Sequence, residues 1–137
     1  MVNFVAGGTG EGKTKTLIRM ANECAKKTDG HLVYIDDDNR HIFDLDINVR
    51  FVETGHWLLT NIGELVGYLL GILSQDNDIK NIFIDGLTKI VREVDNDGLQ
   101  LLFSRLKAIS EQNAVDFVIS MNISREALPE GIRELVL

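Results

Sequence analysis

Short apolar runs alternate along the chain with longer stretches in which apolar residues recur every three or four positions. The runs predict buried strands, and the longer stretches predict amphipathic helices. Strands are expected at residues 2–6, 31–35, 49–53, 81–85 and 115–121. Because strands and helices alternate, the sequence predicts an α/β fold: a three-layer domain whose mainly parallel sheet has helices on both faces.

The helices are predicted from apolar stripes and from capping residues. The first runs over residues 14–25, and the second begins near Asn61, which forms a capping pair with Glu64. The turn at residues 95–98 supplies the N-cap of another helix. Short helices are expected in residues 124–137, around the single proline. Trp57 lies in a loop, and we expect it to pack in the core.

Glycines at positions 63, 67 and 71 are stacked along one face of the second helix. Each glycine inside a helix costs about 1 kcal/mol relative to alanine. A close approach of the backbone to the sheet or to a neighbouring helix would offset this cost, and so would a contact between two copies of the chain. The stripe therefore leaves a homo-oligomer open as a possibility.

Length and charge narrow the class of protein. The 137 residues are enough for one domain, which we place at 1–137. The net charge of −7 argues against a general nucleic-acid surface. Cys24 is the only cysteine and falls on an apolar helix face, so we expect a core thiol and no intrachain disulfide. We also expect no signal peptide, no membrane span and a cytoplasmic location.

The chemistry concentrates near the N-terminus, where residues 7–14 read Gly-Gly-Thr-Gly-Glu-Gly-Lys-Thr. They match the phosphate-binding loop pattern G-x-x-x-x-G-K-[ST], here between a predicted strand and a predicted helix. Glycines let backbone N–H groups converge on a phosphate, and the start of the helix adds unpaired N–H groups. The residues expected to bind the nucleotide are Gly8, Thr9, Gly10, Glu11, Gly12, Lys13, Thr14 and Lys15.

A phosphate loop requires an acid that helps to hold Mg²⁺. Asp85 ends the apolar run at residues 81–85, which places it at the edge of the sheet where the loop also lies. We therefore assign Mg²⁺ to the Thr14 hydroxyl and to Asp85, with water between the acid and the metal. Lys13 is expected to reach the β- and γ-phosphates.

The order of these motifs resembles the RecA-like ATPase core, and the resemblance covers nearly the whole chain. It implies a RecA-like strand order, with strand 115–121 between the phosphate-loop strand and the Asp85 strand. It also implies a catalytic acid just after the second strand, where Asp38 stands, and a γ-phosphate sensor at Asn122. Two departures are plain: Asp38 is one methylene shorter than the glutamate of that family, and Gly86 follows Asp85 where many ATPases carry glutamate.

An arginine that completes the catalytic site is harder to assign. Arg125 and Arg133 are candidates if a neighbouring subunit presents them, and Arg40 is a weaker one. The chain is also similar to very small bacterial P-loop proteins labelled twitching-motility ATPases. We do not expect these residues to form a motor of that type, because its added acidic and histidine motifs are not among them.

These observations favour an ATP-binding P-loop protein, either a slow Mg²⁺-dependent ATPase or an ATP-gated switch that needs a partner or a second subunit. ATP is favoured over GTP because no N-K-x-D guanine signature is present. The alternative is a small nucleoside or nucleotide phosphotransferase similar to thymidine kinase, because residues 16–19 after the loop resemble that family.

Overall fold

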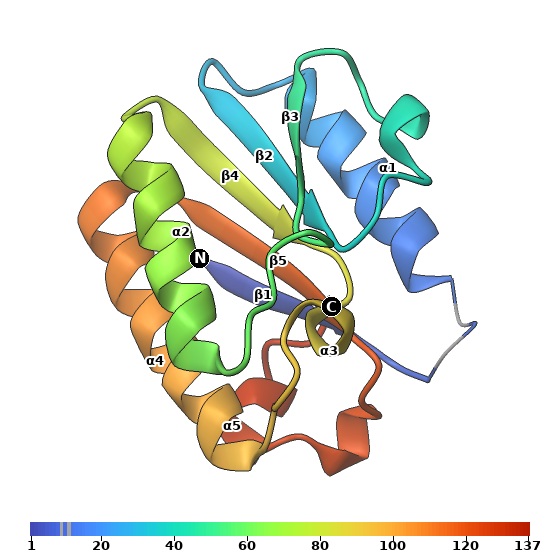
Figure 1. Cartoon of the computed structure of the whole chain (residues 1–137), viewed down its shortest axis with the longest axis vertical. Coiled ribbons are helices and arrows are strands. Elements are labelled where there is room, and N and C mark those ends of the chain that lie inside the picture. The colour runs from blue at the N-terminus through green and yellow to red at the C-terminus, as the bar shows by residue number, and fades with distance from the viewer. Residues whose placement is uncertain (9, 11) are drawn as a thin grey trace.

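The computed structural model describes residues 1–8, 10 and 12–137, and its helices and strands alternate as the sequence predicts (Figure 1). The strands are β1 (Val2–Ala6), β2 (His31–Asp36), β3 (Val49–Glu53), β4 (Ile79–Ile84) and β5 (Asp116–Met121). The helices are α1 (Lys13–Ala25), α2 (Ile62–Gln75), α3 (Leu87–Ile90), α4 (Asn96–Asn113) and α5 (Glu130–Arg133). Two 3₁₀ turns, η1 (Ile42–Asp44) and η2 (Arg125–Ala127), lie in the connections.

The five strands form one sheet in the order β1-β5-β4-β2-β3, and every pair is parallel. Strand β5 pairs with β1 on one side and with β4 on the other. The strand that follows the last long helix therefore separates the phosphate-loop strand from the Asp85 strand, which confirms the strand order expected from the RecA-like resemblance. In a parallel sheet all carboxyl ends lie along one edge, so β1, β5, β4 and β2 deliver their following loops to the same place.

Helices cover both faces of the sheet (Figure 1). Helix α1 packs on one face, where Leu17 and Ala21 lie against a cluster that includes Tyr34 and Phe83. Helices α2 and α4 lie side by side on the other face and bury the larger cluster. The α/β fold with three layers is therefore confirmed, and its two cores flank a sheet that is buried on both sides.

Capping residues fix the start of α2 and the start of α4. The Asn61 side chain accepts a hydrogen bond from the Glu64 N–H at 3.0 Å, and Glu64 in turn accepts one from the Thr60 N–H. The Asp95 carboxylate accepts a bond from the Gly98 N–H at 2.7 Å. Both caps were predicted, because each satisfies an N–H group that the first helical turn leaves without a partner.

The glycine stripe of α2 does not serve close packing. A Cβ added at Gly67 or Gly71 would meet no atom within 4 Å among the described residues, and at Gly63 it would meet only the Asn61 side chain. The prediction of a close backbone approach within the chain is therefore wrong. A contact between two copies stays a prediction.

Two loop segments also differ from expectation. Trp57 is 65% exposed, so the prediction that it packs in the core is wrong. The end of the chain runs beside β1: the Phe4 N–H donates to the Leu135 carbonyl, and the Leu137 N–H donates to the Phe4 carbonyl. Val136 thus forms a parallel bridge with Phe4, on the side of β1 that β5 does not occupy.

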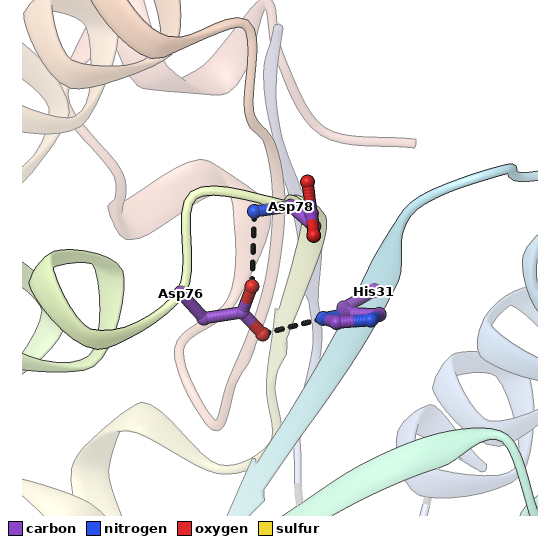
Figure 2. A group of neighbouring side chains, drawn as sticks. All are labelled: His31, Asp76 and Asp78. Carbon is purple, nitrogen blue, oxygen red and sulfur yellow. Dashed lines mark hydrogen bonds and ion pairs between the residues drawn. The ribbon is translucent and has the colours of Figure 1, made fainter.

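A polar cluster ties elements together at the amino edge of the sheet, away from the phosphate loop (Figure 2). Asp76 follows α2 and accepts a hydrogen bond from the Asp78 N–H at 2.9 Å. Its other oxygen lies 2.5 Å from His31 Nδ1 and 3.2 Å from Arg50 Nη1. The His31 bond is the main reason why the pKa of the Asp76 carboxyl is lowered. Asp76 therefore joins α2, β2 and β3, which is a structural role.

Among the described residues, no helix is both long and apolar enough to cross a bilayer.

Candidate nucleotide site

The phosphate loop leads from β1 into α1 at the carboxyl edge of the sheet. Gly12 precedes α1 with φ of 76°, a left-handed conformation that side chains with a Cβ rarely adopt. Among the described residues no side chain caps this helix, and the first backbone bond back to the loop is from the Thr16 N–H to the Gly12 carbonyl at 3.1 Å. The amides of Lys13, Thr14 and Lys15 are therefore available to an anion.

Lys13 reaches back across the loop. Its ammonium donates a hydrogen bond to the Gly8 carbonyl, so the side chain lies over the loop rather than out in solvent. Gly10 and Gly12 line the same concave surface. Thr9 and Glu11, the other two residues predicted to bind nucleotide here, lie outside the described residues. Lys13, Gly10 and Gly12 thus share one concave surface, and the binding of phosphate there stays a prediction.

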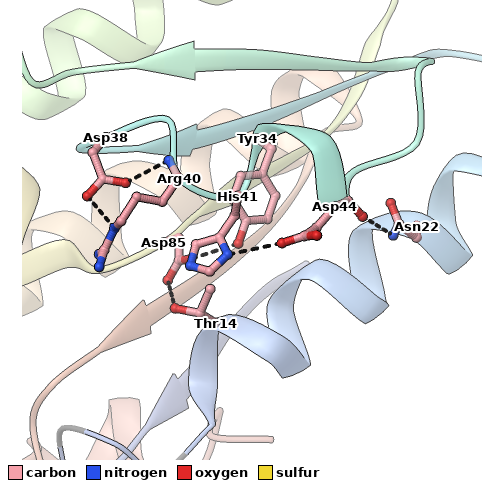
Figure 3. A network of polar contacts seen from close by, with 8 residues as sticks. All are labelled: Thr14, Asn22, Tyr34, Asp38, Arg40, His41, Asp44 and Asp85. Atoms are coloured by element: carbon pink, nitrogen blue, oxygen red, sulfur yellow. Dashed lines mark hydrogen bonds and ion pairs between the residues drawn. The ribbon is translucent and has the colours of Figure 1, made fainter.

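Asp85 follows β4 and is the best-connected polar group of the site (Figure 3). It is buried, and three hydroxyl groups donate to its carboxylate. Thr14 Oγ1 and Ser120 Oγ donate to Oδ1 at 3.3 and 2.8 Å, and Tyr34 Oη donates to Oδ2 at 2.7 Å. The Gly86 N–H donates to Ser120 Oγ, which orients that hydroxyl toward Asp85. Three separate parts of the chain thus hold one carboxylate in a single orientation.

Tyr34 has no exposed surface, and its ring stacks between Phe51 and Phe83 with centroids 6.4 and 6.3 Å away. Burial is the main cause that raises the pKa of its hydroxyl, and the neighbouring Asp85 charge adds to it. The hydroxyl therefore keeps its proton and acts as a donor. We infer that Tyr34 is a positioning residue for Asp85.

Tyr34→Phe should lower the free energy of unfolding by about 1–3 kcal/mol, because it keeps the ring but removes a donor from a buried carboxylate. Chemical denaturation measures the effect. Tyr68→Phe is the matched control, because Tyr68 is the other tyrosine and lies half-buried on α2. Equal stability of the two variants would contradict a special role for the Tyr34 hydroxyl.

The loop, the acid and the end of β5 enclose one pocket of about 230 Å³, which we call the loop pocket. Asn122 follows β5 and lines this pocket, in the place expected for a γ-phosphate sensor. The loop pocket is lined by Gly10, Gly12, Lys13, Thr14, Asp85, Gly86, Lys89, Ser120 and Asn122.

The three acids after β2 differ in their surroundings. Asp36 is buried beside Asp85, since the Asp85 N–H donates to the Ile35 carbonyl at 2.8 Å. Burial raises the pKa of the Asp36 carboxyl to about 8, helped by contact with Asp37 and by the Asp85 charge. Asp38 lies at the surface instead, with Oδ2 2.8 Å from Arg40 Nε (Figure 3).

Asp38 is not among the residues that line the loop pocket. Its predicted role as the acid that orders water would require its ion pair with Arg40 to open. That role stays a prediction, as does the role of Asn122. Asp36 ends β2 at the register position beside Asp85, because Ile35 pairs with Ile84 in the sheet.

The residues present fit a magnesium ion. Mg²⁺ prefers oxygen ligands and keeps several of its waters in protein sites. Thr14 Oγ1 lies 3.3 Å from Asp85 Oδ1, so the hydroxyl could bind the metal directly while the Asp85 carboxylate accepts from a metal-bound water beside it. No lysine or arginine nitrogen lies within 4.0 Å of the Asp85 carboxylate among the described residues, so its charge is open to a cation.

The predicted arginine candidates lie away from the loop pocket. Arg40 pairs with Asp38, and Arg133 donates to the Leu128 carbonyl of its own chain at 2.9 Å. Arg125 is exposed in η2. Sequence reasoning missed Tyr34, Ser120 and Lys89 as site residues. Of these, only Lys89 has a sequence signal, because apolar residues at positions 87 and 90 predict a short helix with Lys89 on its polar side.

A second hollow lies between the first part of α1 and the segment around η1. It is lined by Thr14, Lys15, Ile18, His41 and Asp44, and the His41 imidazole lies 3.1 Å from the Asp44 carboxylate. Thr14 lines both hollows. Lys15 therefore faces this second hollow rather than the loop pocket.

The sequence matches no protein-family model and no curated protein. Among solved structures, one similar chain is a KaiC-like protein from the hyperthermophilic archaeon Pyrococcus horikoshii. The TM-score is 0.64 at 18% sequence identity, and the match covers 97% of this chain and 66% of that chain. The fold is RecA-like. This likeness, together with the order of the strands, confirms the fold expected from the sequence, whereas the similarity to twitching-motility proteins stays a prediction.

Proposed function

We propose that this chain binds ATP with Mg²⁺ and either hydrolyses it slowly or acts as an ATP-gated switch. The observation that carries the proposal is the hydrogen bond between Thr14 and Asp85, which are 71 positions apart and meet at 3.3 Å beside Lys13. A phosphate loop whose threonine contacts a buried, strand-ending acid is the arrangement that a Mg²⁺-bound triphosphate requires. The RecA-like fold is consistent with ATP binding.

Each residue has a stated role in this proposal. The loop amides and Lys13 bind the phosphates, and Thr14 and Asp85 hold Mg²⁺. When bound there, Mg²⁺ would neutralise phosphate charge during transfer. Asn122 contacts the terminal phosphate, and Asp38 orders the attacking water once it separates from Arg40.

A partner or a second subunit completes the site in this proposal. Among the described residues, no arginine lines the loop pocket. Arg125 is exposed, so another copy of the chain could present it to a neighbouring pocket. An arginine supplied in this way stabilises the charge of the transition state, and its absence leaves turnover slow.

Phosphate release from Mg·ATP, measured together with nucleotide binding, tests the proposal. We expect Lys13→Ala to weaken ATP binding by about 10- to 100-fold, because it removes a charged contact to phosphate. Slow release that Asp38→Asn abolishes, with binding kept, would support an ATPase. Binding without release would support a switch. No binding by the unaltered chain would overturn the proposal.

Two further arms separate the alternatives. Competition between ATP and GTP measures base preference, which we expect to favour ATP. Incubation with Mg·ATP and common nucleosides tests the thymidine-kinase-like alternative. Transfer of phosphate to a nucleoside would replace hydrolysis as the activity, while the assignment of the loop pocket would stand.

A further inference from the structure

The loop pocket contains a second cation besides Lys13. Lys89 lies on α3, four positions after Asp85, and lines the same pocket. Lys13 enters the pocket from the phosphate loop, whereas Lys89 enters from the side of Asp85 and Gly86. Two lysines from separate elements that line one pocket suit a ligand with several negative charges.

The position of Lys89 is set by its helix. Leu87 and Ile90 are buried and anchor α3, so Lys89 between them is directed to the surface. Gly86 precedes α3 with φ of 80°, and a Cβ placed there would lie 3.3 Å from Lys89 Cδ and 3.6 Å from Cε. The lysine stem therefore folds back across Gly86 and not away from the site.

The Lys89 ammonium has no close ion-pair partner among the described residues, so its charge is available to a ligand. The pKa of the Asp38 carboxyl is lowered overall. Partial burial raises it, but the hydrogen bonds and charge of Arg40 outweigh this effect, and the Lys89 ammonium adds a smaller contribution. Lys89 thus lies near enough to Asp38 for the two charges to interact, and it also lines the loop pocket. Among the described residues, no carboxylate lies within 4.0 Å of its ammonium.

We propose that Lys89 contacts the terminal phosphate of a bound nucleoside triphosphate, an inference that rests on the proposed nucleotide site. Lys89 enters beside Asp85 and Asn122, where the proposed function places the metal and the terminal phosphate. A diphosphate lacks the group that Lys89 would reach. The contact therefore distinguishes triphosphate from diphosphate, and it supplies within one chain part of the charge that a partner's arginine would add.

The test compares the affinities of a non-hydrolysable ATP analogue and of ADP, both with Mg²⁺, by titration calorimetry. We expect Lys89→Gln to lower the affinity for the triphosphate analogue by about tenfold or more, because a charged hydrogen bond is lost. The affinity for ADP should stay the same. Lys89→Arg should restore most of the preference, because it keeps the positive charge. Lys80→Gln, at the amino end of β4, is the matched control and should change neither affinity.

Failure of this inference differs from failure of the proposed function. If the unaltered chain binds both nucleotides and Lys89→Gln keeps its full preference, or weakens both equally, the Lys89 inference is overturned while the nucleotide site stands. If the unaltered chain binds neither nucleotide, both are overturned. Thermal melting of each variant shows whether a loss of binding reflects a loss of folding.

Discussion

Mg²⁺ should raise the nucleotide affinity of the unaltered chain, and Asp85→Asn should reduce this gain by a factor of about 10 to 100. The substitution keeps the shape of the side chain and an oxygen that can accept from the hydroxyls of Thr14 and Ser120. It removes the negative charge, which is what the metal would use. The amide nitrogen can donate to Tyr34 Oη, so the fold should persist.

The measurement is nucleotide affinity with Mg²⁺ and with a chelator, for the unaltered chain and for the variant. Asp78→Asn is the control, because Asp78 is exposed in the turn before β4 at the other edge of the sheet. A variant that retains the full magnesium effect would contradict the assignment of Asp85 as a metal residue.

Asp36→Asn should stabilise the protein at neutral pH and remove part of its pH dependence. Asp36 is buried near Asp85 and Asp37, and burial raises the pKa of its carboxyl to about 8. In the unfolded chain the same carboxyl loses its proton near pH 4. Between these two values the folded state holds a proton that the unfolded state has lost, so stability falls as the pH rises.

Asp36→Asn should raise the free energy of unfolding by on the order of 2 kcal/mol near pH 8. This is less than the pKa difference between the folded and unfolded states implies, because solvent and neighbouring acids reduce the cost of ionising Asp36. The amide oxygen can still accept the bond that the Asp37 N–H donates to Asp36 at 2.7 Å. Denaturant unfolding at pH 5, 6.5 and 8 measures the effect. Asp29→Asn, in the exposed turn after α1, is the control. Parallel stability profiles for Asp36→Asn and the unaltered chain would show that Asp36 is not held protonated.

The two predictions concern neighbouring acids with opposite expected roles. Asp85 accepts from three hydroxyls and is arranged to receive a cation, whereas Asp36 has few donors and holds its proton. The difference arises from the strands that surround each acid. Asp85 lies between Ser120 of β5 and Tyr34 of β2, while Asp36 ends the strand next to the edge of the sheet.

The sequence by itself determined the succession of strands and helices, the phosphate loop and the position of Asp85 at a strand end. Each depends on local rules: apolar periodicity, caps such as Asn61 and Asp95, and the glycine pattern from residue 7 to residue 14. The strand order was accessible only through the resemblance to RecA-like proteins, because apolar runs do not specify their neighbours in a sheet.

Only the tertiary structure decided which distant side chains meet. Tyr34 and Ser120 reach Asp85 because β4 lies between β2 and β5, and no spacing along the chain encodes that contact. Trp57 is exposed although its large aromatic side chain favours burial. Burial depends on what covers the loop and not on the residue alone. Lys89 points into the loop pocket because buried neighbours fix the rotation of a one-turn helix, a packing effect that arises only when the sheet and its helices assemble.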